Sequence, residues 1–160
     1  MYSEFEPVVE TMLELIAEWE TKLSALADDV ITERRNTQNR NIKQIVGHMI
    51  DSASNNTHRI VHLQYQPSPF AFPNYATFGN NDRWISIQNY QEENWHNLVQ
   101  HWKYANLHVA HVIANIEPDK LENQWIAGEK ELVSLKEMAI DYPRHLKLHM
   151  NEITDLINKK

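Results

Sequence analysis

Residues 134–153 read SLKEMAIDYPRHLKLHMNEI, and this stretch carries the clearest helical pattern in the chain. Ser134 followed by Glu137 three residues later is the pattern of a capping box, which satisfies free backbone groups at the start of a helix. Beyond it, apolar residues recur every three or four positions, as on the buried face of an amphipathic helix: Leu135, Met138, Tyr142, Ile153 and Leu156. The segment therefore predicts a long last helix with one face in the core.

The same periodicity occurs in three earlier segments, each bounded by polar residues or a proline: 5–26, 41–64 and 95–116. The acidic pair 28–29 and the polar stretch 32–40 are expected to end the first of these helices. Asn41 with Gln44 forms a second capping-box pattern at the start of the next one. Pro118 is expected to end the third, because proline has no backbone N–H to donate.

The segment 67–84 interrupts this helical pattern. It mixes prolines with aromatic residues, which is typical of an ordered loop rather than of a flexible linker: Pro67, Pro69, Phe70, Phe72, Pro73, Tyr75 and Phe78. Residues 119–133 are expected to form a loop or a small hairpin. Four helices, with one long aromatic crossover loop between the second and the third, predict an all-α fold. We expect an up-down-down-up four-helix bundle that forms a single domain over residues 1–160.

Length and composition exclude several classes of function. A chain of 160 residues fits one domain that can bury a substantial core. Its 15 basic and 22 acidic residues give a net charge of −7, which argues against nucleic-acid binding through a broad phosphate-neutralising face. The absence of cysteine excludes a thiolate metal site, and three glycines are too few for a phosphate-cradling loop.

The sequence also lacks the marks of a secreted or membrane protein. The N-terminal residues MYSEFE are acidic and do not resemble a signal peptide. No apolar run approaches the ~20 residues that a membrane-spanning helix needs. We therefore expect a cytoplasmic protein that binds neither a membrane nor a nucleic acid.

The chain has nine histidines and no cysteine, so any metal ion that it binds must be held by imidazole and oxygen ligands. His145 and His149 are four residues apart, so they share one face of the last helix and can point at one ion. They also interrupt the apolar stripe between Tyr142 and Ile153, so they are expected to face the interior of the bundle. A histidine pair at this spacing also arises by chance in a histidine-rich helix. The position after His145 is Leu146, so the pair lacks the adjacent glutamate of the zincin signature.

A site inside a bundle needs a third ligand from another helix, and His48 is the best candidate. It lies in the first half of the second helix, near the edge of that helix's apolar stripe. The alternative is a histidine at the edge of the core that hydrogen-bonds a backbone carbonyl.

The remaining histidines fit a shared metal site less well. His58 and His62 are also four apart, but they lie towards the end of the second helix. His62 lies two heptads after His48, roughly 21 Å along the helix axis, so the two cannot share an ion. A second stripe lies opposite the apolar face of the third helix, where a solvated or partner-contacting face is the simpler interpretation: His101, Tyr104, His108 and His111.

Three segments together resemble the DinB/YfiT-like superfamily over nearly the whole chain. Ile42–Ile60 is similar to that superfamily's second helix, where a histidine followed by an apolar residue begins the metal triad and an Arg-Ile pair follows. Leu135–Ile153 is similar to its last helix, in which a tyrosine precedes two histidines four residues apart. The motif NNDRW at 80–84, followed by Trp95, Leu98 and Trp102, resembles its acidic-tryptophan crossover and third helix.

The resemblance implies a four-helix bundle that holds one divalent metal ion, such as zinc, nickel or iron, through three histidines: His48, His145 and His149. It also implies a homodimer. Some members resemble thiol S-transferases that use a low-molecular-weight thiol such as bacillithiol or mycothiol as cosubstrate, and others are described as metal-dependent hydrolases. In either case the substrate would be a small molecule.

Three neutral imidazoles leave an ion with at least one open position, as in catalytic rather than closed structural sites. That position could hold water or a thiol, and both need a proton acceptor. Asp82 and Tyr142 are the candidate catalytic residues, and the 67–84 loop is the expected pocket wall. Asp82 could instead cap the turn before Trp84. Asp141 could orient His145 or could be solvated.

Two classes of function stay open at this point. The first is a metal-dependent transferase or hydrolase. The second is a non-catalytic bundle with a binding or stress-related role, in which an ion, if bound at all, only joins the second helix to the last. An open coordination position beside a pocket would favour the enzyme.

Overall fold

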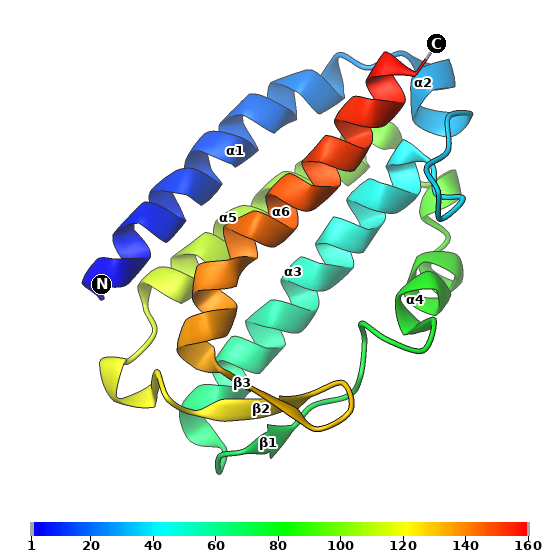
Figure 1. Ribbon diagram of the computed structural model, residues 1–160. Coiled ribbons are helices and arrows are strands. Elements are labelled where there is room, and N and C mark those ends of the chain that lie inside the picture. Colours follow the sequence, from blue (N-terminus) through cyan, green and yellow to red (C-terminus); the bar gives the residue numbers. More distant parts are fainter. Residues whose placement is uncertain (1, 160) are drawn as a thin grey trace.

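Figure 1 shows the computed structural model of the chain, which describes residues 2–159. Four long helices form a bundle: α1 (Glu6–Ser24), α3 (Ile42–Tyr65), α5 (Trp95–Ala114) and α6 (Leu135–Asn158). In the view of Figure 1, α1 and α6 run upwards whereas α3 and α5 run downwards. The expected up-down-down-up order is therefore confirmed. Consecutive parallel helices such as α3 and α5 require a long connection, and the crossover segment supplies it.

Both predicted capping boxes are present. The Asn41 side chain accepts a hydrogen bond from the backbone N–H of Gln44, whose side chain accepts one from the backbone of Asn41. Ser134 and Glu137 make the same reciprocal pair at the start of α6. These caps fix where α3 and α6 begin, and hence the position along the bundle axis of each histidine that they carry.

Several short helices connect the long ones: η1 (Ser3–Phe5), α2 (Asp28–Thr32), α4 (Asn80–Gln88), η2 (Tyr90–Glu92) and η3 (Pro118–Lys120). The acidic pair 28–29 ends no helix; it opens α2, where negative charge suits the positive end of the helix dipole. The crossover is likewise less irregular than expected, because its last part folds as α4.

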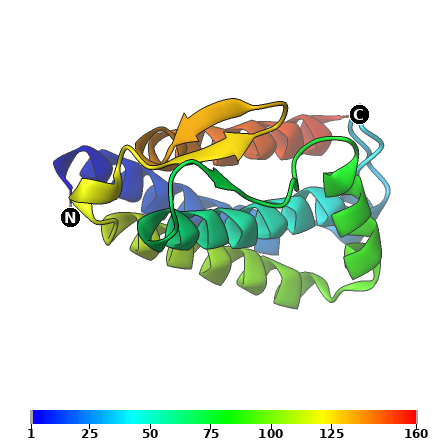
Figure 2. The ribbon, with the colours of Figure 1, turned by 90° about the horizontal axis from the view of Figure 1, so that it is seen from below.

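A small three-stranded sheet contradicts the all-α prediction: β1 (Phe70–Ala71), β2 (Gln124–Ala127) and β3 (Glu131–Ser134). β2 and β3 form an antiparallel hairpin, one of the two forms expected for residues 119–133. Its turn is possible because Gly128 (φ 49°) and Lys130 (φ 77°) adopt positive φ. β1 pairs in parallel with β2, a contact between distant segments that periodicity does not predict. Figure 2 shows the sheet lying along the side of the bundle formed by α3 and α6.

At Gly47 the segment after α4 lies unusually close to α3. A Cβ atom at this position would lie 2.2 Å from Cδ2 of Tyr90, so only glycine leaves room for the ring. The Tyr90 hydroxyl donates to Oδ1 of the buried Asp51 at 2.6 Å. This contact holds the end of the crossover against α3 beside His48.

Candidate metal centre

Three histidines from two helices meet inside the bundle. His48 comes from α3, and His145 and His149 come from successive turns of α6. One ring nitrogen of each lies within 4.8 Å of the corresponding nitrogens of the other two. His48 and His149 are 6% and 5% exposed, whereas His145 is half-buried and forms the more accessible side of the group. Within residues 2–159, no other cluster of potential ligands has this geometry.

The hydrogen bonds of His149 orient its ring for metal binding. Its Nδ1 lies 3.0 Å from Oε2 of Glu152, and because a carboxylate only accepts, Nδ1 carries the proton. Nε2 therefore presents a lone pair, and it lies 3.1 Å from Nε2 of His145. Two nitrogens this close are stable only with a proton or a cation to share. The pair thus has the donor set and the geometry that suit a divalent ion.

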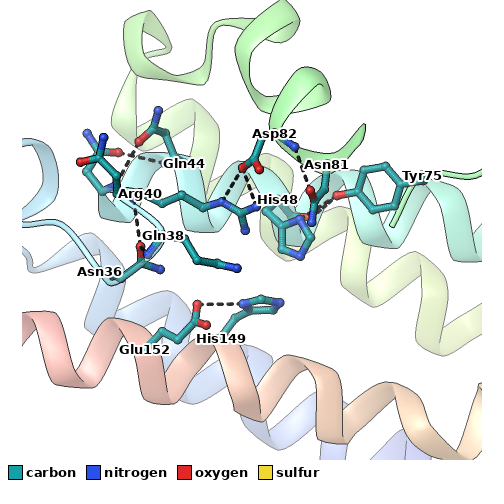
Figure 3. A network of polar contacts seen from close by, with 12 residues as sticks. Asn36, Gln38, Arg40, Gln44, His48, Tyr75, Asn81, Asp82, His149 and Glu152 are labelled. Carbon is teal, nitrogen blue, oxygen red and sulfur yellow. Dashed lines mark hydrogen bonds and ion pairs between the residues drawn. The ribbon is translucent and has the colours of Figure 1, made fainter. Parts of the chain in front are cut away.

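His48 is oriented in a similar way by Tyr75. The Tyr75 hydroxyl lies 2.8 Å from Nδ1 of His48 and 3.3 Å from the His48 backbone carbonyl oxygen. Since the carbonyl can only accept, the hydroxyl donates to it and accepts from Nδ1–H. This arrangement leaves Nε2 of His48 as the free ligand atom. Figure 3 shows His48 with Tyr75 and His149 with Glu152.

Burial keeps the His48 and His145 imidazoles neutral. It lowers the pKa of His48 to about 2, with further lowering from His149, His145 and the Arg40 guanidinium. Burial also lowers the pKa of His145 to about 4; His149 and Arg144 add to this effect, and Asp141 and Glu152 oppose it. Both rings therefore offer lone pairs at neutral pH, as a metal ligand must.

These shifts predict that the metal-free protein loses stability in mild acid. The ordinary histidine pKa of 6.5 applies to the unfolded chain, and the folded values are about 2 and 4. Below pH 6.5 the unfolded state therefore binds more protons, so the free energy of unfolding decreases as the pH falls towards the folded values. We expect a loss of about 1–2 kcal/mol per histidine between pH 7.5 and 5, measured by urea denaturation in the presence of chelator. His145→Gln should flatten this dependence, and an unchanged slope would contradict the prediction.

A cavity of about 760 Å³ opens beside the histidines. The cavity is lined by one face of α3, by the first half of α6 and by the hairpin β2–β3. Figure 2 shows these three elements side by side. His48 and His145 reach it directly, and Tyr75 and Ala76 bring the crossover loop to its edge, as expected for that loop. The site thus adjoins a space that can hold a small molecule.

The structure places the two predicted catalytic residues differently. Tyr142 lines the cavity, and its buried hydroxyl donates to Oδ1 of Asn106 at 2.9 Å. Burial raises the pKa of Tyr142, so it acts there as a neutral hydroxyl. Asp82 is not among the residues that line this cavity. It pairs with the buried Arg40 at 2.6 Å and faces a separate hollow of about 230 Å³.

The other polar groups mentioned above lie apart from the triad. Asp141 pairs with Arg144 on the exposed side of α6, so its carboxylate is engaged there and not by His145. His62 stacks on Phe70, and the histidine stripe of α5 is exposed. Two orienting partners, Tyr75 and Glu152, were not predicted from the sequence. For Glu152 a signal existed, because it lies three residues after His149 on the same helical face.

None of the helices in the described part of the chain combines the length and apolar character needed to cross a bilayer.

No protein-family model matches the sequence, and no curated protein matches it. Among solved structures, YfiT from Bacillus subtilis, described as a probable metal-dependent hydrolase with an unusual four-helix bundle topology, matches with a TM-score of 0.83 and 15% identity. The match covers 98% of this chain and 87% of YfiT. A mycothiol-dependent maleylpyruvate isomerase matches with a TM-score of 0.75 and 11% identity, over 93% of this chain but 60% of the isomerase. The chain therefore has a DinB/YfiT-like fold, which confirms the predicted resemblance at the level of structure.

Proposed function

We propose that this chain, which shares its fold with YfiT, is a metal-dependent thiol S-transferase acting on a small molecule in the cavity beside the triad. The observation that carries the proposal is the combination of three converging histidines with an adjoining cavity. Closed structural sites use four protein ligands, whereas catalytic sites keep one position open. The non-catalytic alternative would require a saturated site, and the cavity beside His48 and His145 argues against it.

A bound divalent ion (zinc, nickel or iron) would supply Lewis-acid chemistry at its open position, where it would lower the pKa of a thiol or of water. His48, His145 and His149 would hold the ion through Nε2. Tyr75 and Glu152 would keep the rings in the required tautomer. Trp125, Leu132 and Val133 of the hairpin would limit the access of water from their side of the cavity.

Thiol transfer is preferred over hydrolysis because the carboxylates that α6 brings to the triad and the cavity are engaged. Glu152 accepts from His149, Asp141 from Arg144, and Glu137 from Ser134. A hydrolytic water needs a general base, whereas a thiol has an ordinary pKa near ~8.5 and ionises readily beside a cation. In the transfer, the sulfur forms a bond to an electrophilic carbon of the acceptor, the leaving group departs with its electron pair, and the thiol proton passes to solvent. The mycothiol dependence of the isomerase with this fold agrees with this choice.

We predict that the purified protein binds one divalent ion per chain and, once loaded, accelerates S-conjugation of small thiols to an activated aryl chloride. Elemental analysis gives the stoichiometry, and absorbance of the conjugate gives the rate. A chelator and His48→Ala should each reduce the rate to the uncatalysed level. Thiol-independent ester cleavage would instead identify a hydrolase. A loaded protein that binds neither thiol nor water at the ion would support the non-catalytic alternative.

A further inference from the structure

Arg59 is a buried cation without an anionic partner. Its side chain lines the cavity, and the residue is 6% exposed. Its Nε and Nη2 nitrogens have no hydrogen-bond partner in the described structure, and no carboxylate in residues 2–159 forms an ion pair with it. An unpaired buried charge is costly, so its presence calls for an explanation.

Aromatic rings hold the Arg59 guanidinium in place. It stacks over Trp125 of the hairpin at 4.2 Å and lies 5.6 Å from the Phe72 ring. Cation–π contacts of this kind hold the guanidinium beside the rings but use none of its five N–H donors. Turning the free edge towards the cavity therefore breaks no hydrogen bond. Burial lowers the pKa of Arg59 to about 10, so it stays charged at neutral pH.

The other cations of the cavity wall are already paired. Lys136 pairs with Glu4 at 2.9 Å, and Arg144 pairs with Asp141. Arg59 is thus the one cavity-lining Lys or Arg, within the described residues, that has no carboxylate partner.

Arg59 and the metal triad lie at two ends of one surface. His48, Ser52, Asn56 and Arg59 all line the cavity from a single face of α3. His48 and Arg59 are about 16 Å apart along the helix axis at ~1.5 Å per residue, and the arginine side chain can span part of this distance. A molecule in the cavity can therefore reach both ends at once.

We propose that Arg59 binds the carboxylate of a small molecule whose other end lies at the triad. A guanidinium edge with two parallel donors matches the two oxygens of a carboxylate. A single arginine beside acidic wall residues such as Glu131 suits a monoanion better than a doubly charged phosphate. The inference rests on the proposed function for the role of the triad end, but the carboxylate site itself needs no metal. The carboxylate belongs either to the thiol or to its acceptor.

The first test uses chelator-treated protein and two probes that differ in charge, hexanoate and hexanol. Binding is followed by NMR on backbone amides and on the Arg59 Nε–H signal. We expect hexanoate to bind about tenfold more tightly than hexanol, because a charged hydrogen bond in a dry site is worth about one factor of ten or more. Arg59→Met should abolish this preference and Arg59→Lys should retain part of it, whereas Arg83→Gln, at an exposed position of α4 outside the cavity, should leave it unchanged.

The second test identifies the source of the carboxylate in the cobalt-loaded protein, through the sulfur-to-cobalt absorption band. If the thiol carries it, 6-mercaptohexanoate should bind about tenfold more tightly than 6-mercaptohexanol, and only while Arg59 is present. If the acceptor carries it, the two thiols should bind alike, and hexanoate should still bind together with 2-mercaptoethanol. Either result supports the proposal.

Equal binding of hexanoate and hexanol to the metal-free protein would overturn the proposal, as would a preference that survives undiminished in folded Arg59→Met. Circular dichroism of both Arg59 variants establishes that they are folded. A cobalt-loaded protein that binds no thiol but keeps its Arg59-dependent preference for hexanoate would contradict the proposed transferase and leave the carboxylate site intact. The two proposals can therefore fail separately.

Discussion

Replacing His149 with alanine is expected to abolish metal binding while the protein stays folded. Loss of an orienting partner of a metal-bound histidine typically costs 10–100-fold in affinity, so loss of a ligand itself should exceed about 100-fold. The bundle should survive because its core is apolar and lies mostly away from the triad: Phe5, Met12, Ile16, Leu23, Leu98 and Trp102. We expect the free energy of unfolding of the metal-free protein to fall by only about 1–3 kcal/mol, the cost of a small cavity.

Metal titration by calorimetry and thermal unfolding by circular dichroism would test both parts. Glu152→Gln is the matched control, because it keeps the shape of the site and removes only the charge that orients His149; it should weaken binding by about 10–100-fold. The wild type should lose on chelation only the stability that metal binding adds by mass action. If chelation or His149→Ala removed the helical signal at room temperature, the ion would be structural and the proposed enzyme would be wrong.

Gly47→Ala is expected to be the most damaging small substitution in the chain. The new methyl group would lie 2.2–2.6 Å from three atoms of the Tyr90 ring, so either the ring or α3 must move. Overpacking of this kind costs about 1–3 kcal/mol or more, and the higher helix propensity of alanine returns at most about 1 kcal/mol. Because His48 follows Gly47 directly, we also expect weaker metal binding.

A double-mutant cycle would assign the effect to this one contact. Tyr90→Ala removes the ring and by itself costs the Tyr90–Asp51 hydrogen bond. In the Tyr90→Ala background, the additional loss of stability from Gly47→Ala should largely disappear. Ser54→Ala, at an exposed position of the same helix, provides the control for helix propensity. Equal losses from Gly47→Ala with and without Tyr90 would show that the contact is not the cause.

The elements that the sequence predicts best are those with local causes. The two capping boxes and the four apolar stripes depend only on residues three or four positions apart. These patterns predict α1, α3, α5 and α6 with nearly correct ends. The convergence of His48 with the α6 pair follows from the same patterns, since each histidine lies at or beside the apolar face of its helix. That they bind a metal stays a prediction.

The features that escaped prediction depend on contacts between distant segments. The pairing of Phe70 with Trp125 creates the third strand, and no local pattern specifies it. The Tyr75–His48 hydrogen bond likewise depends on how the crossover folds back. Asp82 shows the converse case: its place in the crossover loop, the expected pocket wall, suggested a catalytic role, but a buried arginine from the segment before α3 pairs with it.

The division of the triad between α3 and α6 also fixes when the site can exist during synthesis. At a typical rate of about 5–20 residues per second, the ribosome makes His145 roughly 5–20 s after His48. By the end of that interval α1, α3 and α5 have been made, but most of α6 is still missing and His48 has no companion ligand. The nascent chain therefore cannot capture an ion at this site early. Loading must follow closure of the bundle by α6, so the newly made protein must first bring the three histidines together without the ion.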